Sequence, residues 1–230
     1  MLEEVVTLGL LDANPCARIK NRRTKLDENR EIRPFESWDE LEATSEELHE
    51  RYRAVPVVLV GTGLRPEELW GLERQHYERK NGVFNIEQVF TQGRLKPCKK
   101  SDLQRRRVPL RAKVLEAIEA MPTPHRFDGP LFPNHEGDYT RHNTFRLRYW
   151  TPALRAAGIE HRSVYACRHT FASSAIRAGV QLFYLSRVMG TSVAQIDATY
   201  GHLVPDSDEY LRRLLDEYDA RTINSATTSR

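Results

Sequence analysis

The stretch from Tyr165 to Tyr200 limits the possible folds most, because it reads as short consecutive helices separated by glycine. An apolar helical pattern runs up to Gly179, a second apolar run ends at Gly190, and a last short segment reaches Tyr200. Glycine is favoured directly after a helix, where the backbone often turns left-handed. Residues three apart share a helix face, so Tyr165 and Arg168 are predicted to point at one spot.

A second arginine lies far upstream, in the stretch Gly61-Thr62-Gly63-Leu64-Arg65-Pro66-Glu67-Glu68-Leu69. The two glycines end an apolar helical run that contains Pro56, and Pro66 suits the first position of the next helix. Two glutamates in a first helical turn are stabilised by the helix dipole. The pattern therefore predicts that Arg65 sits at a helix start, held on a tight glycine turn.

Strand character is confined to residues 76–110. Val83 to Ile86 alternates apolar and polar residues, and Arg107 to Leu110 closes the same ladder. Helical patterns account for the rest: 2–13, a capped helix from Ser37, then 48–60, 111–121, 140–157, 164–178, 181–189, 192–200 and 207–220. We therefore expect an α+β fold, mostly α-helical, with a small three-stranded antiparallel sheet.

Charge is distributed unevenly along the chain. The formal net charge of +3 and the pI of about 8.8 say little by themselves, but the stretch 94–107 holds one acid, Asp102, and seven bases: Arg94, Lys96, Lys99, Lys100, Arg105, Arg106 and Arg107. Like charges at this density repel each other and favour a polyanionic partner such as nucleic acid. A solvated hairpin is the simpler alternative.

Several classes of protein are disfavoured. The longest apolar run, Val55 to Val60, is too short to span a bilayer, and no basic, apolar leader follows Met1. The cysteines, Cys16, Cys98 and Cys167, are widely spaced and odd in number, which fits neither a disulfide framework nor a zinc site. We expect a cytoplasmic protein that uses no metal and no cofactor.

The residue types present are sufficient to cut a phosphodiester without metal. A tyrosine hydroxyl becomes a useful nucleophile when its proton leaves during the attack. Guanidinium groups match the negative charge on the oxygens of the pentacoordinate transition state, and an ammonium group can protonate the leaving oxygen. Two arginines, a lysine and a tyrosine would therefore supply the chemistry.

Four motifs in order carry a resemblance to a known family. They are GTGLRPEEL around Arg65, RRRVPL at residues 105–110, YACRHTFAS around Arg168, and MGTSVAQIDATYGHL around Tyr200. Together they resemble the catalytic domain of the tyrosine recombinase (phage integrase) family. The resemblance implies that residues 35–205 form this domain, that 1–34 are the last helix of a core-binding domain with a basic linker, and that 206–230 form a C-terminal helix and tail, possibly exchanged between subunits.

The resemblance also implies a role for each matching residue. Arg65 and Arg168 would clamp the scissile phosphate, and Tyr200 would attack it to give a 3′-phosphotyrosyl link and a free 5′-hydroxyl. Lys100 would protonate the leaving oxygen, with Lys99 and Lys96 as alternatives. The side chains expected to contact DNA directly are those of the basic hairpin: Arg94, Lys96, Lys99, Arg105 and Arg106.

Two catalytic positions depart from the family pattern. Tyr165 stands where the family has histidine, and Thr191, nine residues before Tyr200, stands where it has histidine or tryptophan. Both side chains can donate a hydrogen bond to a phosphate oxygen, but neither is a good base, since a phenol has a pKa of about 10. His169 and His202 are the nearby candidates for this task, and a structural role is the alternative for each.

These expectations combine into one function. The chain is predicted to be a site-specific recombinase or integrase that cleaves and rejoins double-stranded DNA in phage or mobile-element integration and excision. It would act as a homo-tetramer on DNA and be a monomer without it. Chromosome-dimer resolution through the same residues is one alternative, and an impaired or non-catalytic DNA-binding protein derived from a recombinase is the other.

Overall fold

The computed structural model describes residues 2–15, 33–98, 105–122, 129–203 and 208–227. The chain divides into two units, Met1–Glu31 and Ile32–Arg230. Helix α1 (Leu2–Thr7) is shorter than the predicted helix 2–13, because the chain turns at Gly9, whose φ is +69°. Helix α12 (Asp208–Thr227) begins as predicted and extends further. The candidate site lies in residues 33–203.

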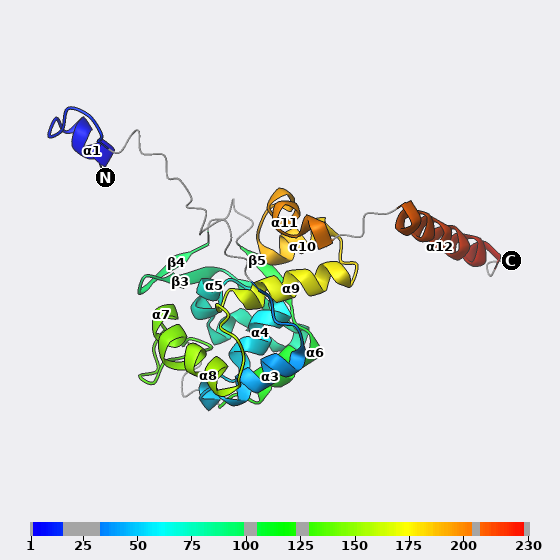
Figure 1. The fold of residues 1–230 in the computed structure, drawn as a ribbon, viewed down its shortest axis with the longest axis horizontal. Coiled ribbons are helices and arrows are strands. Elements are labelled where there is room, and N and C mark those ends of the chain that lie inside the picture. Colours follow the sequence, from blue (N-terminus) through cyan, green and yellow to red (C-terminus); the bar gives the residue numbers. More distant parts are fainter. Residues whose placement is uncertain (1, 16–32, 99–104, 123–128, 204–207, 228–230) are drawn as a thin grey trace. The chain divides into compact units, whose positions relative to one another are not determined.

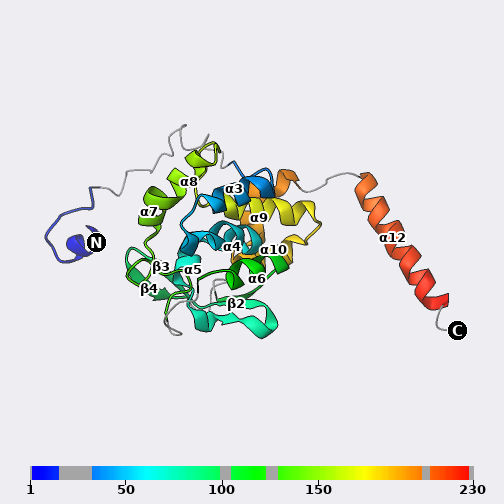
Figure 2. The ribbon, with the colours of Figure 1, turned by 90° about the horizontal axis from the view of Figure 1, so that it is seen from below.

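Helix α4 (Ala54–Thr62) is the central element of this region. It is apolar on all sides and eight of its nine residues are buried, as expected of an interior helix. Three helices pack around it: α3 (Trp38–Glu46), α6 (Ala112–Glu119) and α9 (Ala166–Arg177) (Figure 1; Figure 2). Gly61 allows the close approach of α6, since a Cβ there would lie 2.1 Å from Val114 Cγ2.

Helix α5 (Pro66–Gly71) begins as the sequence predicts. Helix α4 ends at Gly63, whose φ of +66° places it in the left-handed region, and Pro66 occupies the first turn of α5. A Cβ at Gly63 would also lie 2.2 Å from the ring of Phe171 on α9. The glycine is therefore required both for the turn and for the packing of α9, and Arg65 becomes the N-cap of α5.

The predicted three-stranded antiparallel sheet is present, in the order β1 (Tyr77–Glu78), β2 (Val83–Ile86), β5 (Arg106–Pro109). A separate hairpin of β3 (Gln88–Thr91) and β4 (Arg94–Pro97) was not predicted. Gln92 and Gly93 form its turn, both with positive φ, which suits a two-residue hairpin connection. Strand β3 packs on α5 at Gly71, where a Cβ would lie 2.8 Å from Val89 Cα.

The remaining helices continue the predicted pattern. Helix α7 (His142–Phe145) passes through a π-helical turn, Arg146–Trp150, into α8 (Thr151–Ala156). After α9 follow α10 (Leu182–Met189) and α11 (Val193–Tyr200), then a 3₁₀ turn, Gly201–Leu203. No helix in the described ranges is long and apolar enough to cross a membrane.

Two hydrophobic clusters hold these elements together. The main cluster contains the largest fully buried side chains, among them Trp70, Trp150 and Tyr52, and includes residues of α3 to α9. The second is small and joins α9, α10 and α11 through Ala172, Ile176, Leu185, Met189, Ile196 and Tyr200. Phe171 is half-buried and packs against both clusters.

Candidate active site

A cavity of about 380 Å³ brings the predicted catalytic residues together. Five of the six line it: Arg65 at the start of α5, Tyr165 and Arg168 at the start of α9, Thr191 before α11, and Tyr200 at the end of α11. The sixth, Lys100, and its alternative Lys99 lie outside the described residues. The expected convergence of the two arginines and the tyrosine is therefore observed, while their roles stay a prediction.

Arg65 is fixed by three hydrogen bonds. Its backbone N–H donates to Glu68 Oε2 at 2.8 Å, Nη1 donates to Glu68 Oε1 at 3.0 Å, and Nη2 donates to the carbonyl oxygen of Gly190 at 2.9 Å. Within the described ranges, the guanidinium itself makes two of these contacts, to Glu68 and Gly190, and it carries five N–H donors. The side chain is 31% exposed, which leaves donors available to an anion in the cavity.

Glu68 is buried beneath this arginine and is shared with Arg106. Nη1 and Nη2 of Arg106 donate to its two carboxylate oxygens at 2.9 and 2.8 Å. Burial acts to raise the pKa of Glu68, but the hydrogen bonds and charge of Arg106, with those of Arg65, outweigh it and hold the pKa below its usual value. The carboxylate is therefore ionised and orients both guanidinium groups.

The expectation that Arg106 contacts DNA directly needs correction. Its side chain is 6% exposed, and besides Glu68 it reaches the carbonyl oxygen of Val188, to which Nε donates at 2.6 Å. A buried carboxylate requires a paired charge, and Arg106 supplies it. Arg106 is thus part of the support beneath Arg65 and is not a surface contact.

Arg168 is almost fully buried on the first turn of α9. Its Nη1 donates to the carbonyl oxygen of Gly63 at 2.6 Å, so the end of α4 fixes the side chain. Burial, followed by the charge of Arg65, lowers the pKa of Arg168. Two guanidinium groups close enough to repel each other make the cavity a favourable place for an anion.

Tyr200 is 7% exposed and lies against the imidazole of His169. Its hydroxyl and Nδ1 of His169 are 2.8 Å apart. Burial raises the pKa of Tyr200 to about 12, with Tyr165 adding to the effect and Arg168 opposing it. The phenol is therefore protonated at neutral pH, and it can act as a nucleophile only if another group takes its proton.

Tyr165 and Thr191 both face this cavity. The ring of Tyr165 meets that of His169 edge to face, with centroids 5.3 Å apart. Two further polar residues of the lining, Gln195 and Thr199, were not predicted. They are four residues apart on α11 and hydrogen-bonded, Nε2 to Oγ1, at 3.3 Å. The spacing of four residues from Thr191 to Gln195 and from Gln195 to Thr199 was the signal available in the sequence.

The other described residues of the basic hairpin that were expected to contact DNA, Arg94, Lys96 and Arg105, are exposed. Arg94 and Lys96 alternate along β4 and so share one face of it. Arg105 donates to Glu87 at 3.0 Å, and both side chains of this pair are open to solvent.

His202, the other candidate base, is exposed in the 3₁₀ turn after Tyr200.

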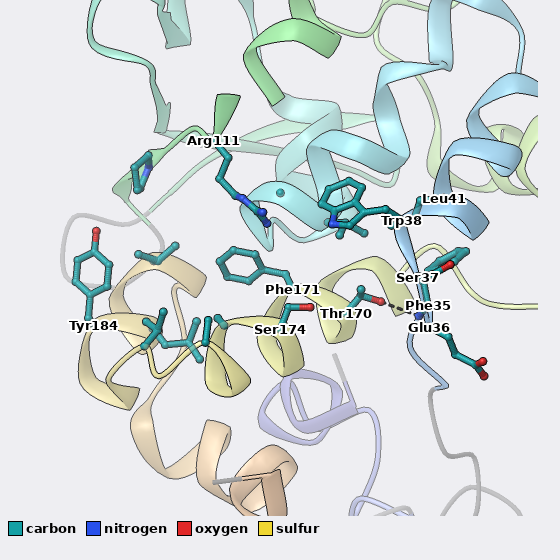
Figure 3. Close-up of a pocket in the computed structure, with 18 residues that line it drawn as sticks. Phe35, Glu36, Ser37, Trp38, Leu41, Arg111, Thr170, Phe171, Ser174 and Tyr184 are labelled. Carbon is teal, nitrogen blue, oxygen red and sulfur yellow. Dashed lines mark hydrogen bonds between the residues drawn. The ribbon is translucent and has the colours of Figure 1, made fainter. Parts of the chain in front are cut away.

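A larger cavity of about 510 Å³ lies elsewhere, between α3, α9 and α10. Figure 3 shows Trp38, Phe171 and Tyr184 around it, with Thr170 accepting a hydrogen bond from the backbone of Phe35 at 2.8 Å. Its lining is mainly apolar and holds no nucleophile paired with a base, so we do not place the chemistry there. In the described parts of the chain, no cluster of acidic, histidine or cysteine residues is arranged to bind a metal.

These features agree with the comparison to known protein families. The model of the phage integrase family matches residues 35–206, and the chain belongs to this family. The match confirms the predicted resemblance, and the fold described above confirms the predicted fold class.

Two curated relatives illustrate the similarity. Tyrosine recombinase XerC of Pelobacter propionicus is 25% identical over 221 residues, which cover 94% of this chain and 67% of the relative. Prophage integrase IntR of Escherichia coli is 27% identical over 233 residues, covering 90% and 56%. Two further relatives are covered over 42% and 58% of their lengths, so the chain corresponds to part of these proteins.

Solved structures show the same fold. The Tn1549 transposon integrase in complex with a circular intermediate DNA superposes with a TM-score of 0.68 at 16% identity, over 94% of this chain and 75% of that one. The catalytic domain of bacteriophage HP1 integrase gives a TM-score of 0.55 at 17% identity, over 80% and 95%. At these identities the likeness establishes the fold.

Proposed function

We propose that this chain is the catalytic part of a site-specific DNA recombinase that cleaves and rejoins DNA through a 3′-phosphotyrosyl intermediate. The observation that carries the proposal is the convergence of Arg65, Arg168 and Tyr200 on one cavity. Family membership and relatives named as recombinases and integrases support it. Its biological task would be the integration and excision of a phage or another mobile element.

In this proposal the scissile phosphate occupies the cavity. The guanidinium groups of Arg65 and Arg168 donate to its non-bridging oxygens and stabilise the charge that grows there in the transition state. Removal of one such preorganised donor typically costs about 3–4 kcal/mol of activation free energy. Tyr165 and Thr191 donate further hydrogen bonds, and Tyr200 attacks the phosphorus.

A lysine of the basic hairpin would protonate the 5′ oxygen as it leaves. Lys100 holds the position that the family pattern favours, and Lys99 and Lys96 are the alternatives. Of these, Lys96 lies in the described part of the chain, on the exposed strand β4. Separate alanine variants at the three positions would assign the role, since only one should lose cleavage at unchanged DNA affinity.

The partner we propose is double-stranded DNA. Arg94, Lys96, Lys99 and Arg105 would contact its backbone, with Arg105 exchanging Glu87 for a phosphate. Each phosphate contact releases counterions, so the affinity should fall steeply with salt concentration. Among the similar structures, the Tn1549 integrase and the XerH recombinase were solved bound to DNA, which supports this partner.

The proposed domain limits are 1–34, 35–205 and 206–230.

The proposed active assembly is a tetramer on DNA. Helix α12 carries exposed apolar side chains at the spacing of one helical face: Leu211, Leu214, Leu215 and Tyr218. We propose that this face packs into the 510 Å³ cavity of a neighbouring subunit. A chain that ends at residue 205 should then still bind DNA but form no tetramer on it in size-exclusion chromatography with light scattering.

The function is tested by covalent capture on DNA. A pool of nicked suicide duplexes of randomised sequence traps the protein if it cleaves, because the short strand beyond the cut diffuses away. The expected result is a protein–DNA adduct on a denaturing gel that disappears in Tyr200→Phe. Tyr149→Phe, in the π-helical turn and outside the lining of both cavities, should retain the adduct. An adduct that survives in Tyr200→Phe would contradict the assignment.

The same assay separates the alternatives. A non-catalytic DNA-binding protein would shift DNA on a native gel and leave no adduct. The departures at Tyr165 and Thr191 are the features that suggested it, but the family and its relatives do not favour it. Chromosome-dimer resolution would use the same residues and would be recognised by the sequence of the captured site.

A further inference from the structure

One proton in the proposed reaction still lacks an acceptor: the proton of the Tyr200 hydroxyl. The titratable side chains that line the cavity are Arg65, Tyr165, Arg168, His169 and Tyr200 itself. Arginine stays protonated in proteins, and an ordinary phenol is not a proton acceptor near neutral pH. In the described lining, His169 is therefore the side chain able to accept a proton at neutral pH.

The geometry already places His169 in contact with that proton. Its Nδ1 is 2.8 Å from the Tyr200 hydroxyl, within the reach required of a general base. The phenol of Tyr200 is a much weaker acid than the imidazolium of His169, with a pKa of about 12 against about 4. The hydroxyl therefore donates and Nδ1 accepts, which places the ring hydrogen on Nε2.

The other ring nitrogen supports a functional role. Nε2 of His169 is buried and has no hydrogen-bond partner in the described residues. Buried polar atoms are almost always paired, so an unpaired one calls for an explanation. If His169 served only for packing, a hydrogen bond to Nε2 would stabilise the fold. A general base requires only that the lone pair of Nδ1 be available to the proton of Tyr200.

The position of His169 also compensates for the departure at Tyr165. The family pattern places a histidine at position 165, and this chain has its imidazole four residues later, one turn along the same face of α9. The two rings meet with centroids 5.3 Å apart, so His169 lies beside the position that the family pattern assigns to histidine. It also follows Arg168 directly, so one helix turn carries both a phosphate ligand and the acceptor.

We propose that His169 is the proton acceptor for Tyr200, which rests on the recombinase reaction proposed above. The Oη–H bond breaks toward Nδ1 as the Oη–P bond forms and the P–O5′ bond breaks, and the leaving oxygen takes a proton from the hairpin lysine. In rejoining, the 5′-hydroxyl attacks the phosphotyrosyl phosphorus and gives its proton to the lysine. The imidazolium then returns its own proton to Oη of Tyr200.

The charges around His169 fit an acceptor that works when substrate is present. Burial, followed by the charge of Arg168, lowers the pKa of His169 to about 4, so the imidazole is neutral at neutral pH. The charged or titratable groups that face it are Arg168 and Tyr165 from α9, Arg65 from α5 and Tyr200 from α11. A phosphate bound by the arginines adds negative charge that stabilises the imidazolium as it forms.

The test is single-turnover cleavage of a suicide duplex by wild type and His169→Asn. Asparagine offers Oδ1 close to the place of Nδ1 and keeps a hydrogen-bond acceptor, but it cannot take the proton. We expect cleavage to slow by about 10²–10⁴-fold, the usual contribution of a general base, at unchanged DNA affinity. His202→Asn is the matched control and should cleave like wild type, because His202 is exposed outside the cavity.

A substrate with sulfur in place of the 5′ bridging oxygen separates the two proton transfers. A thiolate leaves without being protonated, so the defect of a hairpin-lysine variant should disappear on it and the defect of His169→Asn should persist. Equal rates for wild type and His169→Asn, or a His169→Asn defect that disappears on the sulfur substrate, would overturn the proposal. If wild type itself forms no adduct, the recombinase function fails, and the acceptor role with it.

The wild-type pH profile decides the question if the variants do not fold. An acceptor that must be neutral gives a rate that falls as the pH drops through its pKa, which we expect between about 4 and the free-histidine value of about 6.5. If its thermal midpoint shows that His169→Asn is folded, the cleavage rate of this variant should not fall over that pH range. A wild-type rate that stays constant from pH 8 down to 4 would show that no such group titrates and would overturn the proposal.

Discussion

The two arginines of the candidate site and Tyr200, its proposed nucleophile, are supported by very different parts of the molecule. Arg65 follows α4, the buried centre of the main hydrophobic cluster, and is braced by Glu68 and Arg106. Tyr200 belongs to a six-residue cluster formed by α9, α10 and α11. Arg65 is thus supported by a large core, and Tyr200 by a small one.

This difference predicts that the two halves of the site differ in local stability. Segments with few buried apolar contacts open at lower free energy than the elements of a main core. Helix α11 buries only Ile196 and Tyr200, whereas all but one residue of α4 are buried. The arginines therefore form a rigid cradle, and the tyrosine is the part of the site that is free to adjust.

The largest expected effect comes from removing a buried member of the cradle. Arg168→Ala should slow cleavage by about 10²–10³-fold, or about 3–4 kcal/mol, because a preorganised donor to the phosphate is lost. Single-turnover rates of adduct formation measure it. Arg177→Ala is the matched control, on the same helix but exposed. A similar loss in both variants would show that the effect is not specific to the site.

Truncating a side chain in the main cluster should destabilise the whole domain, whereas truncating one in the small cluster should destabilise α11 locally. Leu59→Ala, in the centre of α4, should lower the free energy of global unfolding by about 2–5 kcal/mol, since it leaves a cavity in the main core. Ile196→Ala should mainly lower the free energy of local opening of α11. Hydrogen exchange measures this, with faster exchange over residues 193–200 and little change in α4. Equal acceleration of both helices by Ile196→Ala would mean that the two clusters unfold as one.

Helix caps offer a smaller version of the same comparison. Ser192 accepts from the backbone N–H of Gln195 at 3.1 Å, and Ser37 accepts from that of Glu40 at 3.2 Å. Each alanine variant should cost about 1 kcal/mol. Ser37→Ala should appear in the global denaturation midpoint, whereas Ser192→Ala should appear chiefly in exchange of α11. The comparison fails if Ser192→Ala lowers the global midpoint as much as Ser37→Ala does.

A separate prediction concerns pH. The folded chain holds the pKa of His169 near 4, below the value of about 6.5 for a free histidine. Between these values the unfolded chain binds a proton that the folded chain does not, so stability falls as the pH drops from about 6.5 to 4. The thermal midpoint of wild type should therefore drop more over this range than that of His169→Asn. Equal drops would assign the titration to another group.

Local signals in the sequence were enough to place the arginines. Gly63 and Pro66 marked the end of one helix and the start of the next, which positions Arg65. The spacing of Tyr165 and Arg168 placed both at the start of α9. The hairpin β3–β4 was not predicted, because Gln92 and Gly93 are a weaker turn signal than asparagine with glycine.

The burial of Arg106 was partly readable from the sequence. Arg105 and Arg107 flank it, and alternation along a strand puts Arg106 on the opposite face from both. A count of charges over residues 94–107 does not show that Arg106 faces the other way, and no local pattern indicates that its ion-pair partner is Glu68. The contact between Tyr200 and His169 likewise joins residues 31 apart through packing between α9 and α11, which sequence spacing does not give.

The braced arginines have a consequence for engineering this protein. Arg65 and Arg106 share Glu68, and each also donates to a carbonyl near the end of α10, that of Gly190 and that of Val188. One carboxylate thereby ties the loop that presents Thr191 to the start of α5. Substitutions at Glu68 and at position 191 are therefore coupled, and a library meant to alter substrate choice should randomise the two together rather than in separate rounds.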